Sequence, residues 1–186
     1  MRRVQVIPSI SVFVAVVLAT AACTPRHPQP SPSPSLAMPS AAASSQDPRA
    51  AAVQAAVAAY RSMWAAYDAA VAVPNPDDAA LAMYATGNAL KTLTSGLQSV
   101  KGQGLKGTGA VVVAPKVTAV SPASAPTDVS LSDCMDTSGT HIVRASPGPP
   151  YSDSPGGRRL ATATVQRQGD GSWKVTDFGI RGVGTC

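Results

Sequence analysis

Residues 158–180, RRLATATVQRQGDGSWKVTDFGI, decide the fold class of this chain. Within this stretch, residues 160–168 and 172–180 are rich in the Thr, Val and aromatic residues that favour β-strands. They flank Gly169-Asp170-Gly171, a combination that favours the tight turn of a hairpin. The C-terminal part of the chain is therefore predicted to be antiparallel β-structure.

Three further strands are predicted upstream of the hairpin, because the apolar residues there recur with a period near two. Residues 110–120 are rich in Val but contain Pro115, which suits an edge or bulged strand. Residues 128–136 alternate cleanly between apolar and small polar side chains, and residues 139–145 form a short strand. The glycine-rich run 102–107 follows no strand and is predicted to be a linker.

Two helices are predicted before the strands. Asp47-Pro48 is an N-cap followed by a proline in the first turn. Apolar residues then recur at spacings of three and four as far as Pro74-Asn75-Pro76, namely Val53, Val57, Tyr60, Trp64, Tyr67 and Val71. Asp77 or Asp78 begins a second helix, which Gly87 weakens. The predicted fold class is α+β, with two N-terminal helices packed on a curved antiparallel sheet.

The N-terminal segment has the organisation of a secretory signal peptide. Arg2 and Arg3 precede the apolar run 12–18, and small residues lead to Cys23. This arrangement resembles the lipobox of bacterial lipoproteins, although Thr20 stands where leucine is usual. We therefore predict that lipid on Cys23 anchors the chain to the outer face of the cytoplasmic membrane. A plain secreted signal or an uncleaved membrane anchor is the alternative.

A tether is predicted after the signal peptide. Proline and serine alternate between residues 30 and 34, and such a stretch stays extended because it cannot bury a core. His27 lies in this tether, so it is not a candidate ligand or catalyst. The predicted parts are a signal peptide, 1–22, a Pro/Ser/Ala-rich disordered tether, 23–47, and an α+β domain, 48–186.

Two cysteines, Cys134 and Cys186, remain for the domain if Cys23 takes lipid. Export favours a disulfide between them. Free thiols or a metal site are the alternatives, although two thiols and one nearby histidine are one ligand short of a structural zinc site. No other spacing of His, Cys and Asp indicates a metal, and no glycine-rich motif indicates a cofactor.

The order of these features resembles the nuclear transport factor 2-like superfamily, which includes the SnoaL-like cyclases and ketosteroid isomerase. The resemblance covers residues 48–186 and rests on Tyr60 and Trp64 in a long first helix, a proline break before an Asp-led second helix, and a closing hairpin that carries Trp173. Actinobacterial lipoproteins of this kind look similar in their Ala-rich helices and in the positions of their cysteines. The resemblance implies a cone-like fold.

The resemblance also implies candidate catalytic residues, because enzymes of this superfamily use an Asp or His inside the cone to move a proton. Asp133 and Asp136 flank Cys134, so on a strand they point to opposite faces. His141 follows a possible turn at residues 137–139 that would bring it within reach of one of them. The favoured interpretation is instead a surface hairpin in which Asp136 caps that turn and His141 is solvated, so no catalytic residue is predicted.

The aromatic residues lie mainly in the predicted helices and in the last strand. They form either the core between helices and sheet or the lining of a pocket at the open end of the cone. Alternation places Trp173 and Val175 on one face of the last strand and Phe178 on the other. The candidate ligand-binding residues are Tyr60, Trp64, Tyr84 and Trp173.

Charge and motifs limit the possible functions. The chain has 15 basic and 10 acidic residues, a formal net charge of +5, and no basic patch with interleaved aromatics, so nucleic-acid binding is not predicted. We predict a non-enzymatic, lipid-anchored domain, monomer or dimer, that binds a small apolar ligand or a cell-envelope protein. One alternative is an extracytoplasmic isomerase- or cyclase-like enzyme that uses Asp133, Asp136 or His141. Another is a filled cone whose outer sheet face binds protein.

Overall fold

A computed structural model describes residues 47–186, so the predicted signal peptide, the lipid site at Cys23 and nearly all of the tether lie outside the described residues. The described part is α+β, as predicted. None of its helices has the length and apolar character needed to cross a membrane. Its elements are α1 (Pro48–Ala72), α2 (Ala79–Tyr84), α3 (Gly87–Gly102), β1 (Leu105–Thr108), β2 (Lys116–Ser121), β3 (Asp128–Asp136), β4 (His141–Arg144), β5 (Arg158–Arg167) and β6 (Trp173–Ile180).

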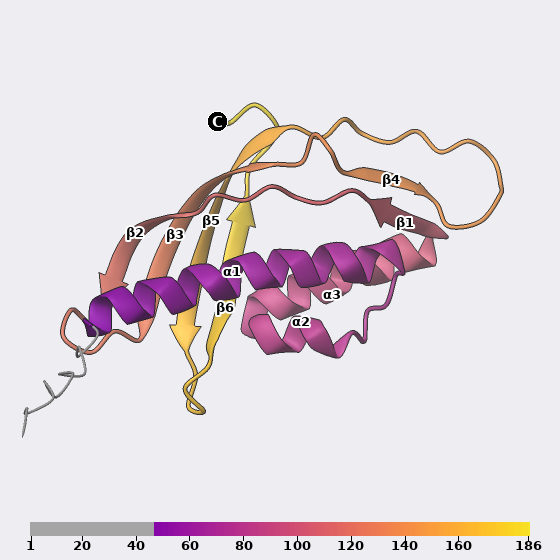
Figure 1. Cartoon of the computed structure of the whole chain (residues 1–186). Helices are drawn as coiled ribbons and strands as arrows, with labels where there is room; N and C mark the ends of the chain where they lie inside the picture. The colour runs from indigo at the N-terminus through magenta and orange to yellow at the C-terminus, as the bar shows by residue number, and fades with distance from the viewer. Residues whose placement is uncertain (1–46) are drawn as a thin grey trace, which may run out of the picture. The chain divides into compact units, whose positions relative to one another are not determined.

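Helix α1 begins and ends where the sequence predicts. The Asp47 carboxylate accepts a hydrogen bond from the backbone N–H of Arg49 at 3.0 Å, which caps the first turn. The helix then lies across one side of the sheet (Figure 1). Its buried face combines alanines with a central group of large side chains and consists of Ala52, Ala56, Ala59, Tyr60, Met63, Trp64, Ala70 and Val71.

The predicted second helix is divided into α2 and α3. Ala85 and Thr86 interrupt it, and the Thr86 N–H donates to the Val175 carbonyl of β6 at 2.9 Å. Gly87 follows with φ of +57°, a conformation that glycine adopts without strain. The sequence indicated a weak point at Gly87, but only the contact with β6 turns it into a complete break.

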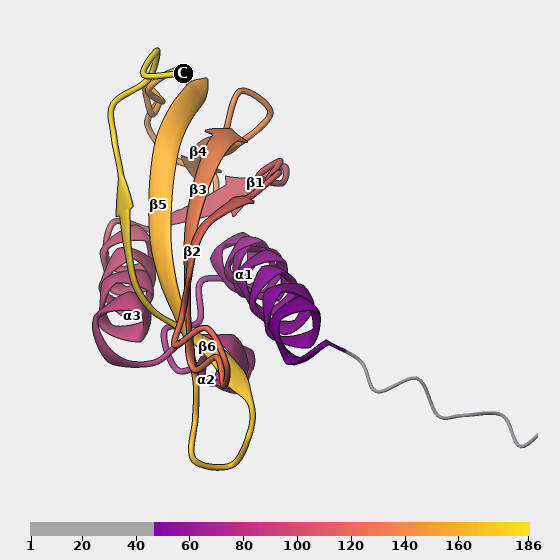
Figure 2. The same cartoon turned by 90° about the vertical axis from the view of Figure 1, so that its left-hand side faces the viewer.

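The main sheet has four antiparallel strands in the order β2-β3-β5-β6 (Figure 2). Strands β3 and β5 pair without irregularity from Asp128↔Gln166 to Asp136↔Arg158. The alternation predicted for β3 is confirmed, because Val129, Leu131, Asp133 and Met135 are buried and the residues between them are less so. This inner face packs on α1 and forms the core with it.

The predicted strand over residues 110–120 is shorter than expected. Only β2 forms part of the sheet, at its edge and with a bulge at Thr118, while Val112 forms an isolated bridge. The Val111 and Ala114 N–H groups donate to the carboxylates of Asp68 and Asp133 instead of to a neighbouring strand. Pro115 has no N–H to donate, so β2 begins directly after it.

The linker predicted over residues 102–107 was wrong. Residues 105–108 form β1, which pairs with β4 in a two-stranded antiparallel ribbon from Leu105↔Arg144 to Thr108↔His141. Gly107 allows this ribbon to approach α1, because a Cβ atom at this position would lie 2.6 Å from Cγ1 of Val71. Glycine is therefore required at position 107 for packing against α1, and it does not indicate a linker.

The side-chain pattern predicted for β6 was wrong at one residue. The register shifts by one between the pairs Val165↔Val175 and Thr164↔Asp177, so Thr176 is an extra residue in β6. A shift of one residue reverses the face of every later side chain. Phe178 consequently turns inward and packs edge-on against Trp64, with 5.4 Å between the ring centroids.

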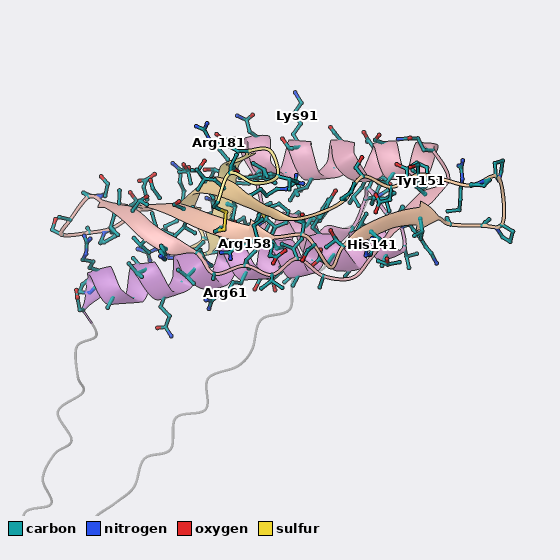
Figure 3. The ribbon with its side chains drawn as sticks, turned by 90° about the horizontal axis from the view of Figure 1, so that it is seen from above. Arg61, Lys91, His141, Tyr151, Arg158 and Arg181 are labelled. Atoms are coloured by element: carbon teal, nitrogen blue, oxygen red, sulfur yellow. A yellow bond between two sulfur atoms is a disulfide. The ribbon has the colours of Figure 1, made fainter. Side chains whose placement is uncertain are left out.

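The C-terminal residues are tied to the sheet. Cys134 and Cys186 form a disulfide with 5.9 Å between their Cα atoms. The Gly184 N–H donates to the Arg158 carbonyl at 2.8 Å, and the Arg158 Nε lies 3.3 Å from Sγ of Cys134. Figure 3 shows this bridge beside Arg158, on the outer face of the sheet.

Candidate functional site

Three polar groups are buried where α1 meets the sheet. They are the Tyr60 hydroxyl, the Trp64 indole N–H and one carboxylate oxygen of Asp133, and none has a hydrogen-bond partner among residues 47–186. The other Asp133 oxygen accepts from the Ala114 N–H at 3.0 Å. Burial raises the pKa of the Tyr60 phenol and the negative charge of Asp133 adds to the rise, while the nearby Trp64 N–H opposes it.

Trp64 lies at the centre of the aromatic residues of the core. Its ring is edge-on to Tyr60, Tyr67 and Phe178, with centroid distances of 6.2, 6.0 and 5.4 Å. The prediction that helix aromatics form the core is therefore confirmed for Tyr60 and Trp64. Trp64 also lines a cavity, which lies beside the C-terminal half of α1.

This cavity has a volume of about 200 Å³ and lies between α1, the β1–β4 ribbon and the C-terminal ends of β3 and β6. Its wall is mostly apolar. The apolar side chains are those of Trp64, Tyr67, Val71, Val111, Met135, Ile142 and Ile180. The polar ones are those of Asp68, Thr108, Thr137, Thr140 and His141.

Asp68 is the acidic residue in the cavity wall. Its Oδ2 accepts a hydrogen bond from the Val111 N–H at 3.0 Å, and no Lys or Arg of the described chain lies within salt-bridge distance of it. Burial raises the pKa of the carboxyl, although the Val111 N–H works in the opposite direction. Burial also raises the pKa of Tyr67, and the charge of Asp68 contributes to that rise.

The three candidate catalytic residues of the enzymatic alternative do not come together. Asp133 is in the core, and Asp136 lies on the opposite face of β3, where its carboxylate accepts from the Ser138 N–H at 2.8 Å and caps the turn. His141 reaches neither of them, because its Nδ1 lies 3.4 Å from Oδ2 of Asp153. Its side chain is 60% exposed, and Figure 3 shows it on β4 at the edge of the molecule. It is the member of this set that lines the cavity.

The four predicted ligand-binding residues have different environments. Trp64 lines the cavity, whereas Tyr60 is fully buried beside it and Tyr84 is partly buried against the core. Trp173 lines a separate surface groove between the start of α1 and the β5–β6 hairpin. Asp68 was not predicted, although the sequence held a sign of it: it is the single acidic residue between Pro48 and Ala72, and it is four residues after Trp64.

Neither a protein-family model nor a curated protein matches this chain. Among solved structures, the intermembrane space region of chloroplast protein ARC6 is similar, with a TM-score of 0.47 and 13% sequence identity. The similar region covers 68% of this chain and 94% of that chain. This degree of similarity supports no argument about function.

Proposed function

We propose that this chain is a lipid-anchored extracytoplasmic protein whose domain binds a small, largely apolar ligand in the cavity between α1 and the β1–β4 ribbon. The observation that supports this proposal is the cavity itself, with its volume of about 200 Å³ and its mostly apolar wall. An apolar cavity of roughly 150 Å³ holds benzene. The ligand is therefore about the size of one substituted ring.

The cavity is a better ligand site than the hollow on the outer face of the sheet. That hollow is lined mainly by the small hydroxyl side chains of Thr118, Ser130, Ser132, Thr162 and Thr164. These side chains offer little apolar surface, and burial of apolar surface is the main source of affinity for small ligands. In the cavity, two aromatic rings and several aliphatic side chains surround the space.

Binding is tested with benzyl alcohol as a neutral single-ring probe. The titration follows the indole N–H resonances of isotope-labelled protein by NMR. We expect the Trp64 resonance to shift, because Trp64 lines the cavity, and the Trp173 resonance to stay in place. A protein in which neither resonance moves at millimolar probe would overturn the proposal.

Two variants show whether the probe enters the cavity. Val111→Phe fills the space and should weaken benzyl alcohol binding by about tenfold or more. Val112→Phe is the matched control, because the neighbouring side chain is 66% exposed and does not line the cavity. Equal affinities in the two variants would place the probe elsewhere.

The membrane anchor has its own test. Cys23→Ala removes the sulfur that would carry the lipid, so the variant should leave the membrane fraction and appear in the soluble exported fraction. The mass of the mature wild-type N-terminus should show a diacylated Cys23. A wild-type chain without lipid, or a variant that stays with membranes, would contradict the anchor.

The enzymatic alternative depends on His141, since this residue lines the cavity and is held by Asp153. An enzyme would return a chemically altered ligand, whereas a binding protein returns it unchanged. Mass spectrometry of a recovered native ligand, with wild type and His141→Ala compared, separates the two. A product formed by wild type and lost in the variant would favour the enzyme.

A further inference from the structure

The cavity wall carries an unequal distribution of charge. Asp68 is acidic and no Lys or Arg lines the cavity, so His141 is the one basic side chain among the wall residues. His141 lies 3.4 Å from its own carboxylate partner, Asp153, which does not line the cavity. Within the described chain, the negative charge of Asp68 is therefore not neutralised by a positive side chain.

The surroundings of Asp68 match one class of ligand. Trp64 precedes Asp68 by four residues on α1, so the two side chains lie on the same face of the helix, one turn apart. Tyr67 is next to Asp68 in sequence, and its ring is perpendicular to that of Trp64 at 6.0 Å. Aromatic rings attract cations, and a desolvated carboxylate binds an N–H donor more strongly when the donor is charged.

We infer that the ligand of this cavity carries a protonated amine, which is bound by the Asp68 carboxylate and by the rings of Trp64 and Tyr67. This inference rests on the proposed ligand-binding function of the cavity. An anionic ligand would be repelled by Asp68. A neutral one would form a weaker hydrogen bond with the carboxylate than a charged N–H donor does.

The structural role of Asp68 uses one of its two carboxylate oxygens. Oδ2 receives the Val111 N–H and thereby fastens the segment before β2 to α1, while Oδ1 takes part in no hydrogen bond within residues 47–186. An asparagine could accept the same Val111 bond through its own oxygen. The charge, as distinct from the acceptor, is therefore available to a ligand.

The test compares benzylamine with benzyl alcohol, which have the same ring and the same number of heavy atoms. We expect wild-type protein to bind the amine about tenfold or more tightly than the alcohol, by the shift of the Trp64 indole resonance. In Asp68→Asn, the ratio of the two affinities should fall close to one. In Asp136→Asn the preference should remain, because Asp136 also accepts a backbone N–H but lies on the outer face.

The outcomes separate this inference from the function on which it rests. If benzyl alcohol binds and the amine has no advantage, or keeps its advantage in Asp68→Asn, the inference is overturned and the proposed function stands. If neither probe moves the Trp64 resonance, both are overturned. Should Asp68→Asn fail to fold, the His141→Ala protein, whose cavity wall keeps Asp68 but no basic side chain, is titrated at falling pH, where protonation of Asp68 should abolish the preference for the amine.

Discussion

The Asp68 carboxylate accepts a hydrogen bond from the Val111 N–H at 3.0 Å, which joins α1 to a segment 43 residues further along the chain. This segment lies between β1 and β2 and contributes Val111 to the cavity wall. One side chain thus both closes the cavity and places a negative charge in it. Asp68 therefore contributes both to the attachment of this segment to α1 and to the charge of the cavity wall.

Asp68→Ala should lower the free energy of unfolding by about 1–3 kcal/mol, because the Val111 N–H loses a charged acceptor. Asp68→Asn should lower it less, since the amide oxygen accepts the same bond. Urea denaturation of the three proteins measures both changes. Equal losses in the two variants would show that charge, and not the acceptor, holds the Val111 segment.

The stability contribution of Asp68 should depend on pH with a defined sign. Burial raises the pKa of its carboxyl above the ordinary value of 3.8, so the folded chain holds this proton at a pH where the unfolded chain has lost it. The resulting stabilisation is fully present below the ordinary pKa and is lost as the pH rises through the raised pKa.

Urea denaturation of wild type and Asp68→Asn from about pH 7 to about pH 3 measures this dependence. As the pH falls through the window, the free energy of unfolding of wild type should rise relative to that of the variant, which has no proton to gain at this position. A difference that is constant, or that changes in the opposite direction, would contradict the raised pKa.

Gly107→Ala should destabilise the protein by about 1–3 kcal/mol, because the new Cβ would lie 2.6 Å from Cγ1 of Val71. Gly102→Ala is the control, since no atom lies within 4 Å of a Cβ at that position. In the double variant with Val71→Ala, the total loss of stability should be smaller than the sum of the losses in the two single variants, because the clashing methyl group is gone. Additive effects in thermal or urea unfolding would argue against close approach of β1 to α1.

Replacing both Cys134 and Cys186 by Ala should lower the free energy of unfolding by about 4 kcal/mol, because the bridge closes a loop of sequence separation 52. Binding of benzyl alcohol should be preserved in protein that remains folded, since neither cysteine lines the cavity. Urea denaturation and the NMR titration measure the two quantities. A loss of binding with little loss of stability would show that the C-terminal residues shape the cavity.

Local patterns in the sequence predicted much of the fold. The start of α1 depends on Asp47 and Pro48, which act within one helical turn. The alternation of β3 and the turn at residues 169–171 likewise depend on neighbouring residues, and both predictions are confirmed. The disulfide between Cys134 and Cys186 was also predicted from the cysteine content of the sequence, and it is confirmed.

Other features depended on contacts between residues distant in sequence. Thr176 became a bulge next to Val175, whose carbonyl is bound by Thr86, and this shift turned Phe178 toward Trp64. Periodicity within β6 could not predict it, since the added residue is defined only by the register with β5. Gly107 was assigned to a linker for the same reason, because the absence of a side chain there is required by contact with Val71, which is distant in sequence.

The sequence by itself determined where α1 begins, which side of β3 is buried and where the last hairpin turns, because caps, turns and periodicity act over a few residues. Tertiary structure alone decided the position and the charge of the cavity. The cavity is assembled from residues as far apart as Trp64 and Ile180, and its charge comes from Asp68, which in sequence is one acid on an alanine-rich helix. In the folded chain this acid is partly buried in a wall that also contains Trp64 and Tyr67, and burial raises the pKa of its carboxyl.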